Sequence, residues 1–288
     1  MLKTVWLTEQ SNREKSVAML LGGFDGLHVG HRLLLERAKG YALPVGVMTI
    51  VGGKSEENLF TFEEREEIFK SAGVDFVFEL PFGEIKDLSA EAFLNLLIQE
   101  FSPKVFVCGE DFRFGKKAAG NADMIKECPH VRGEVLSLLE KDGEKVSSSQ
   151  VKKLLNEGKI GEANALLCHP FFLLGEVRAD RKIGRTIGFP TANVLYPSGK
   201  FPLKRGVYET QTTVDGKTYR GITNFGARPT FDDDTVLTET YLDGFDGDLY
   251  GREIKVEFIR FLREIEKFES VEKLQEQLTK DIRQVRDQ

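Results

Sequence analysis

The stretch Gly22-Gly23-Phe24-Asp25-Gly26-Leu27-His28-Val29-Gly30-His31 decides how the first half of this chain folds. An apolar run at residues 17–21 precedes it and a helical pattern at residues 32–42 follows, so the order is strand, glycine-rich turn, helix. Glycines let the backbone bend sharply and let a ligand approach closely. The helix start offers unpaired N–H groups and partial positive charge. The turn therefore predicts a phosphate site.

Two of the four histidines of the chain, His28 and His31, lie in this turn, three residues apart. If the helix begins near Leu27, both rings lie on one helix face and point at the phosphate site. The alternative is a pair of structural histidines near a helix cap. The spacing favours a catalytic pair.

Composition limits the class of protein. The chain has 288 residues, enough for two ordinary domains, and 41% hydrophobic residues, enough for a packed core. A net charge of −6 argues against a general nucleic-acid or anionic-membrane surface. The three cysteines form no Cys-x-x-Cys pair, and no apolar run approaches the roughly 18 residues of a membrane span. These features predict a reduced, soluble, cytoplasmic protein. We further expect a monomer or weak homo-oligomer.

The first half of the chain alternates between strand and helix patterns. Strands are expected at residues 17–21, 44–51, 75–80, 105–108 and 135–139, and helices from 28, at 61–72, from Ser89 to 98 and at 150–157. This order predicts an α/β, Rossmann-like domain with a parallel sheet and helices on both faces. Ligands bind such sheets at the carboxyl ends of the strands, where the glycine–histidine turn lies.

The pattern changes after residue 168. Strands are expected at 171–177, 207–214, 218–223, 236–242 and 253–261, with a hairpin at Asp215-Gly216 and one helix capped by Ser270. A run of strands closed by one helix predicts a small antiparallel β-barrel with a C-terminal helix across it. We expect one domain at 1–167 and a second at 168–288.

Two further stretches of the first half suit phosphate. Gly109-Glu110-Asp111-Phe112-Arg113-Phe114-Gly115-Lys116 fails the Walker rule, because five residues separate its glycines and Lys117 follows the lysine. Ser147-Ser148-Ser149 precedes a helix, and three hydroxyl groups are more than a cap needs. The alternative for the first stretch is a charged surface turn, and the alternative for the serine run is a plain N-cap.

The second half has one such stretch, Gly184-Arg185-Thr186-Ile187-Gly188-Phe189-Pro190-Thr191-Ala192-Asn193. Its glycines admit phosphate, and Thr191 and Asn193 offer oxygen ligands to Mg²⁺, which typically binds a few protein oxygens plus nucleotide phosphates. Farther on, Glu239 interrupts an otherwise uncharged strand pattern. A lone strand glutamate is more often exposed than catalytic, so this residue needs further support.

These motifs resemble known ones. His-x-Gly-His after an apolar strand resembles the nucleotidylyltransferase signature, and the longer Gly-x-Phe-Asp-Gly-x-His-x-Gly-His resembles the bacterial bifunctional riboflavin kinase/FAD synthetase family. The loop at 109–115 is similar to that family's Gly-x-Asp-Phe-Arg-Phe-Gly, the stretch 146–152 to its Ile-Ser-Ser-Thr-x-Ile-Arg, and 188–193 to its Gly-Phe-Pro-Thr-Ala-Asn. Glu239 lies as far ahead of Asp248-Leu249-Tyr250-Gly251 as the catalytic glutamate of the family does.

The resemblance implies two reactions: phosphorylation of riboflavin by ATP in the barrel, and transfer of AMP from ATP to FMN in the sheet domain, with Mg²⁺ as cofactor. It implies catalytic roles for His28, His31 and Glu239, and metal binding by Thr191 and Asn193. ATP and flavin contacts in the first domain are expected from Gly23, Phe24, Asp25, Gly26, Gly30, Asp111, Phe112, Arg113, Ser147, Ser148, Ser149 and Lys152. In the second domain they are expected from Gly184, Arg185, Gly188, Pro190, Thr191, Asn193 and Arg228.

The chain departs from the family pattern at two places. The family has Thr-Phe-x-Pro-His-Pro after its second strand, whereas here Ile50-Val51-Gly52-Gly53-Lys54 follows Thr49. Lys152 replaces the family's arginine, which keeps the charge and loses the planar fork that grips phosphate. Two alternatives therefore remain: a riboflavin kinase with an impaired adenylyltransferase domain, and a flavin- or nucleotide-sensing regulator without turnover.

Overall fold

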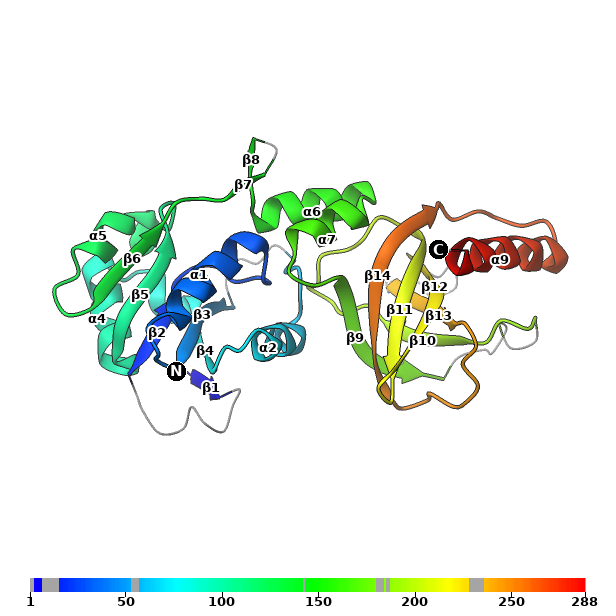
Figure 1. Ribbon diagram of the computed structural model, residues 1–288, viewed down its shortest axis with the longest axis horizontal. Helices are drawn as coiled ribbons and strands as arrows, with labels where there is room; N and C mark the ends of the chain where they lie inside the picture. Colours follow the sequence, from blue (N-terminus) through cyan, green and yellow to red (C-terminus); the bar gives the residue numbers. More distant parts are fainter. Residues whose placement is uncertain are drawn as a thin grey trace. The chain divides into compact units, whose positions relative to one another are not determined.

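The computed structural model of the chain describes residues 3–6, 16–52, 57–141, 143–179, 184, 187–227 and 236–287. It divides into two compact units, Met1–Gln150 and Val151–Gln288 (Figure 1). Among the described residues, no helix has both the length and the apolar character needed to cross a bilayer.

The N-terminal unit is built on a six-stranded sheet with the order β1-β4-β3-β2-β5-β6. Its strands are β1 (Lys3–Trp6), β2 (Val17–Leu20), β3 (Val45–Val51), β4 (Phe76–Pro81), β5 (Pro103–Gly109) and β6 (Arg132–Leu136). Strands β2 to β6 are parallel, as predicted, whereas the short edge strand β1 pairs antiparallel with β4 and escaped prediction.

The connections reverse direction beside β2. Helices α1 (Val29–Lys39) and α2 (Phe62–Ser71) lead the chain from β2 to β3 and β4, and α4 (Ala90–Phe101) and α5 (Ala122–Lys126) lead it to β5 and β6 on the other side. Because such crossovers are right-handed, the two helix pairs cover opposite faces of the sheet (Figure 1). The point of reversal lies between β2 and β5, where ligands bind in folds of this type.

Successive side chains along each strand point to opposite faces of the sheet, and both sets are apolar. Met19, Met48, Phe78 and Phe106 are buried in one apolar cluster with the residues of α4 and α5. The intervening strand residues, such as Leu20 and Val47, are also buried. Both faces of the sheet are apolar, as parallel strands between two helix layers require.

Short elements complete this unit. They are α3 (Phe82–Ile85), a 3₁₀ turn at Lys116–Ala118, and a hairpin of β7 (Glu140–Lys141) and β8 (Glu144–Lys145). The helix α6 (Ser148–Glu157) spans the division between the two units and is followed by α7 (Ile160–Leu166). The pattern at 150–157 predicted α6, whereas α7 was not predicted.

The C-terminal unit contains a closed antiparallel barrel with the order β10-β13-β12-β11-β14-β9, which confirms the predicted class. Its strands are β9 (Phe171–Arg178), β10 (Thr191–Leu195), β11 (Gly206–Val214), β12 (Lys217–Ala227), β13 (Val236–Leu242) and β14 (Glu253–Arg263). Asp215 and Gly216 form the predicted hairpin between β11 and β12, both at positive φ. Strand β10, which carries Thr191 and Asn193, was not among the predicted strands.

The C-terminal helix α9 (Val271–Arg286) begins at the predicted cap, where the Ser270 hydroxyl accepts a hydrogen bond from the Lys273 N–H. Ile282 and Val285 of α9 pack on Val207 of β11 and Ile222 of β12. The helix therefore covers part of the outer surface of β11 and β12, and β12 is the direct neighbour of β13, which carries Glu239.

Candidate functional sites

The glycine–histidine turn leads into α1, and a histidine side chain caps the start of this helix. His28 is the N-cap of α1, and its Nδ1 accepts a hydrogen bond from the His31 N–H at 3.1 Å. The two imidazole rings stack with centroids 3.6 Å apart and planes 16° from parallel. The structure therefore brings the two predicted histidines into direct contact at the start of α1.

The hydrogen bonds define which nitrogen of each neutral ring carries the proton. Nδ1 of His28 accepts, so the proton of the neutral ring is on Nε2. Nδ1 of His31 lies 2.9 Å from the Gly26 carbonyl oxygen, which only accepts, so this ring carries its proton on Nδ1. The neutral pair thus offers one donor, His28 Nε2–H, and one lone pair, His31 Nε2.

Both rings are held in the neutral form. Burial, with a smaller contribution from the nearby Lys145 ammonium, lowers the pKa of His28 to about 4. Burial also lowers the pKa of His31 well below its usual value, with contributions from His28 and Lys145. A bound phosphate would oppose both shifts, because it favours an imidazolium.

The other turn residues shape the backbone around the histidines. The Asp25 carboxylate accepts a hydrogen bond from the Leu59 N–H at 2.8 Å, and the Phe24 ring lies 4.3 Å from the His31 ring. A Cβ at Gly26 would approach Phe60 within 2.9 Å, and one at Gly30 would meet the His28 ring at 3.2 Å. At Gly23 a Cβ would meet nothing within 4 Å, so its surroundings are open to a ligand.

The loop after β5 is fixed by packing at one end and by charge at the other. Phe114 is buried in the core cluster, Phe112 stacks on it at 5.4 Å, and Gly115 fits closely against Ala90 at positive φ. The Asp111 carboxylate forms an ion pair with Lys145. Arg113 is exposed on the same loop.

The serine run divides between a cap and a helix turn. The Ser147 hydroxyl accepts a hydrogen bond from the Gln150 N–H at 3.3 Å. Ser147 therefore caps α6, which was the alternative to a phosphate-binding role for the serine run. Ser148 is half-buried and Ser149 exposed in the first turn of α6. The Lys152 ammonium lies 5.6 Å from the centre of the Phe201 ring in the C-terminal unit.

The departure from the family motif lies at the end of β3. Thr49 is buried, Ile50 is 42% exposed, and Gly52 has a φ of +68°. Gly53 and Lys54 lie outside the described residues.

The C-terminal unit contains a cavity of about 1030 Å³. Gly184, Pro190, Thr191, Asn193 and Glu239 all line it, so five of the predicted kinase residues meet in one place. Gly188 does not line the cavity and lies in the adjoining turn at a φ of +80°. The predicted residues Arg185 and Arg228 lie outside the described part of the chain.

Strand register aligns the polar side chains of this cavity. Asn193 of β10 and Asn224 of β12 are the two direct neighbours of Glu239 of β13. The Asn224 amide nitrogen lies 3.4 Å from a Glu239 carboxylate oxygen. Thr191 shares the cavity-facing side of β10 with Asn193, since alternate strand residues point the same way. Sequence reasoning missed Asn224 because the pairing of β12 with β13 has no local signal.

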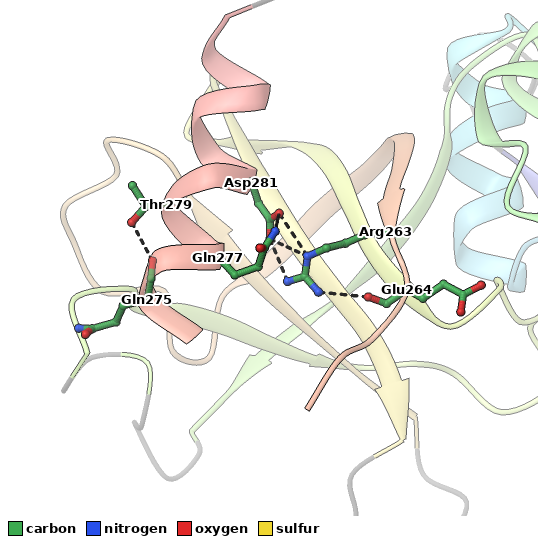
Figure 2. A network of polar contacts seen from close by, with 6 residues as sticks. All are labelled: Arg263, Glu264, Gln275, Gln277, Thr279 and Asp281. Atoms are coloured by element: carbon green, nitrogen blue, oxygen red, sulfur yellow. Dashed lines mark hydrogen bonds and ion pairs between the residues drawn. The ribbon is translucent and has the colours of Figure 1, made fainter. Parts of the chain in front are cut away.

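Helix α9 and the segment before it form the opposite side of the cavity, with Arg263, Ile265, Phe268, Leu274 and Leu278. Figure 2 shows how the helix is attached: the Arg263 guanidinium donates to both oxygens of the Asp281 carboxylate at 2.9–3.2 Å, and Gln277 donates to the same carboxylate. Asp281 is 3% exposed. The Gln275 amide also donates to the Ile187 carbonyl, close to the predicted nucleotide motif.

Comparisons with known proteins agree with this division. The sequence model of the FAD synthetase family matches residues 9–150, and that of the riboflavin kinase family matches residues 167–288. The bifunctional riboflavin kinase/FMN adenylyltransferase of Listeria monocytogenes is 32% identical, over 97% of this chain and 96% of its own length. The enzyme of the same name from Buchnera aphidicola is 34% identical, over 92% and 91%.

A solved structure agrees over the same length. A protein from Streptococcus pneumoniae described as a macrolide-efflux protein superposes with a TM-score of 0.86 at 28% identity, over 95% of this chain and 94% of its own. The relatives match almost from end to end, and both halves of the chain match the corresponding family models. The chain belongs to the bifunctional riboflavin kinase/FMN adenylyltransferase family.

Proposed function

We propose that this chain phosphorylates riboflavin to FMN and then adenylylates FMN to FAD, each with its own ATP. The observation that carries the proposal is the meeting of Glu239, Asn193 and Thr191 in one cavity, with the stacked His28–His31 pair at the reversal point of the other unit. Each set of residues has the chemistry that one of the two reactions needs.

In the kinase reaction, Glu239 acts as the base. Its carboxylate accepts the proton of the terminal ribityl hydroxyl as that oxygen attacks the γ-phosphorus of ATP, and the bond from this phosphorus to the bridging oxygen breaks to leave ADP. The apolar side chains of α9 and of the segment before it, such as Leu274 and Phe268, suit the flat flavin ring at the other side of the cavity.

The donor set on β10 fits a magnesium ion. The Thr191 hydroxyl and the Asn193 amide supply neutral, hard oxygen atoms on one face of a strand, opposite Glu239. No group of three or more histidine, cysteine or acidic side chains within the described residues could hold a metal alone. This matches an ion that takes its remaining ligands from nucleotide phosphates. Thr191 and Asn193 would hold Mg²⁺ there, which would supply positive charge next to the transferring phosphoryl group.

In the adenylyl transfer, an FMN phosphate oxygen attacks the α-phosphorus of ATP and pyrophosphate leaves. The nucleophile is already charged and needs no base. Catalysis consists of in-line positioning and charge stabilisation by His28 Nε2–H and by the N–H groups at the start of α1. His31 adds a donor once the bound phosphates favour its imidazolium form. Both reactions use small molecules, and we place them in the cytoplasm, where ATP is made.

The test is direct. Purified protein is incubated with riboflavin, ATP and Mg²⁺, and the flavins are separated by chromatography. We expect FMN to appear first and FAD to follow. FMN without FAD at any Mg²⁺ concentration would support the monofunctional alternative, and unchanged riboflavin would support the sensor.

A further inference from the structure

The adenylyl-transfer site needs a full positive charge that its histidines do not supply in the free protein. Both rings are neutral, and ATP brings about four negative charges at neutral pH. The helix start contributes a partial charge of about half a unit. Lys152, which the sequence suggested for this task, has its ammonium beside the Phe201 ring of the C-terminal unit.

A different lysine lies beside the histidines. Lys145 is the last residue of the β7–β8 hairpin, and its ammonium pairs with the Asp111 carboxylate. Asp111 follows the end of β5, and β5 is the direct neighbour of β2, whose end carries the glycine–histidine turn. Two neighbouring strand ends therefore bring Lys145 and His28 to the same edge of the sheet.

The base of the hairpin confirms this location. The Val146 N–H donates to the Leu139 carbonyl at 3.0 Å and closes the hairpin beside Lys145. A Cβ at Gly30 would lie 4.0 Å from Leu139, so the hairpin base packs on the first turn of α1. In agreement with this position, the charge of Lys145 lowers the pKa of both His28 and His31.

The different solvent exposure of His28 and Lys145 indicates which part of ATP this lysine contacts. His28 is 8% exposed and lies at the helix start, whereas the Lys145 side chain is 43% exposed at the rim of the site. The α-phosphate must stay inside, where the nucleophile reaches it, and the pyrophosphate must leave toward solvent. A lysine, whose charge sits at the end of a flexible four-carbon stem, suits the departing group at this rim.

We propose that Lys145 binds the pyrophosphate end of ATP in the adenylyl-transfer site, with Asp111 holding its ammonium in place until the nucleotide arrives. The proposal rests on the FMN adenylyltransferase function. Lys145 moves no proton and forms no covalent bond. It stabilises the negative charge that builds on pyrophosphate as the bond between the α-phosphorus and the bridging oxygen breaks.

The experiment uses the full chain with Lys145→Ala, Lys145→Arg and the control Lys141→Ala, which lies on the other strand of the same hairpin. FMN adenylylation is measured as a function of ATP, with pyrophosphate as the added inhibitor. For Lys145→Ala we expect a loss of kcat/KM for ATP of roughly 10- to 100-fold, the scale of one charge-assisted hydrogen bond. The inhibition constant of pyrophosphate rises with it, and the KM for FMN stays within about twofold.

Two comparisons separate binding from a structural role. Lys145→Arg keeps most of the activity, and Lys141→Ala and riboflavin phosphorylation are unaffected. In an Asp111→Asn background, the alanine substitution still weakens pyrophosphate inhibition. The proposal is overturned if Lys145→Ala has no effect on pyrophosphate inhibition in the Asp111→Asn variant. In that case the only role of Lys145 would be to hold Asp111. It is also overturned if pyrophosphate inhibits the parent and Lys145→Ala equally. A parent that makes no FAD contradicts the proposed function itself.

Discussion

His28 and His31 have different hydrogen-bonding roles although they are neighbours on one helix turn. His28 caps the helix through Nδ1, while His31 donates from Nδ1 to Gly26. The spacing of the two residues predicts that they share a helix face. The direction of each hydrogen bond depends on where the backbone of the turn lies, which follows from the packing of Phe24 and Phe60 rather than from the motif.

The neutral His28 has a consequence for stability. Its pKa is about 4 in the folded protein and about 6.5 unfolded. Between these values the unfolded chain binds more protons, so the folded state loses stability as the pH falls through this window. His28→Asn keeps the cap and removes the titration. From pH 7.5 to 5 the parent should lose about 2 kcal/mol more than the variant.

Urea unfolding followed by tryptophan fluorescence measures this loss. Trp6 is the single tryptophan of the chain, and its backbone lies in β1 of the N-terminal unit. Parallel stability curves for the parent and His28→Asn over this pH range would show that His28 is not held neutral by the fold.

At the element scale, α9 depends on a buried ion pair. Asp281 is 3% exposed and accepts from Arg263 and Gln277 (Figure 2). Asp281→Asn leaves the guanidinium without its counter-charge, and removing one partner of a buried pair costs about 3 kcal/mol or more. We therefore expect amide protection across residues 271–286 to fall in hydrogen exchange, and the KM for riboflavin to rise, because Leu274 and Leu278 line the cavity.

The control for this prediction is Glu276→Gln on the same helix. Glu276 pairs with Lys273 at the exposed surface, where an ion pair contributes little. Hydrogen exchange should therefore match the parent. If Asp281→Asn behaved like Glu276→Gln, the ion pair would not be what holds α9 on the barrel.

Most elements could be predicted from local patterns, and the exceptions have physical causes. The Ser89 and Ser270 caps mark α4 and α9, because a cap is a local interaction. Strand β10 could not be found in this way: Thr191–Leu195 follows a proline and a glycine, and it becomes a strand by pairing with β9 and β13. The row Asn193–Glu239–Asn224 arises from the same long-range pairing, so motif reasoning found two of its members and missed the third.

At the scale of the whole molecule, we propose a domain boundary near residue 168. The contacts of α7, which precedes this boundary, indicate that the helix belongs with the barrel. The Asn164 side chain donates to the Phe258 carbonyl and accepts from the Phe171 N–H, both at 2.8 Å. Ile160, Ala163 and Leu166 are buried. We expect fragments 168–288 and 151–288 both to phosphorylate riboflavin, with the longer one melting at a higher temperature because it keeps α7.

Circular dichroism melting and the kinase assay test both fragments. Equal melting temperatures would show that α7 adds nothing to the barrel. If neither fragment had activity while the full chain did, the C-terminal unit would not work alone.

The central claim is that two separate sites catalyse two reactions, and crossed variants test it most directly. Glu239→Gln and His31→Ala are each assayed for FMN formation from riboflavin and for FAD formation from supplied FMN. Glu239→Gln should lose roughly 100-fold or more of the first rate and keep the second. His31→Ala should lose about two orders of magnitude of the second rate and keep the first. Loss of both rates in either variant, or full activity in both, would contradict the account.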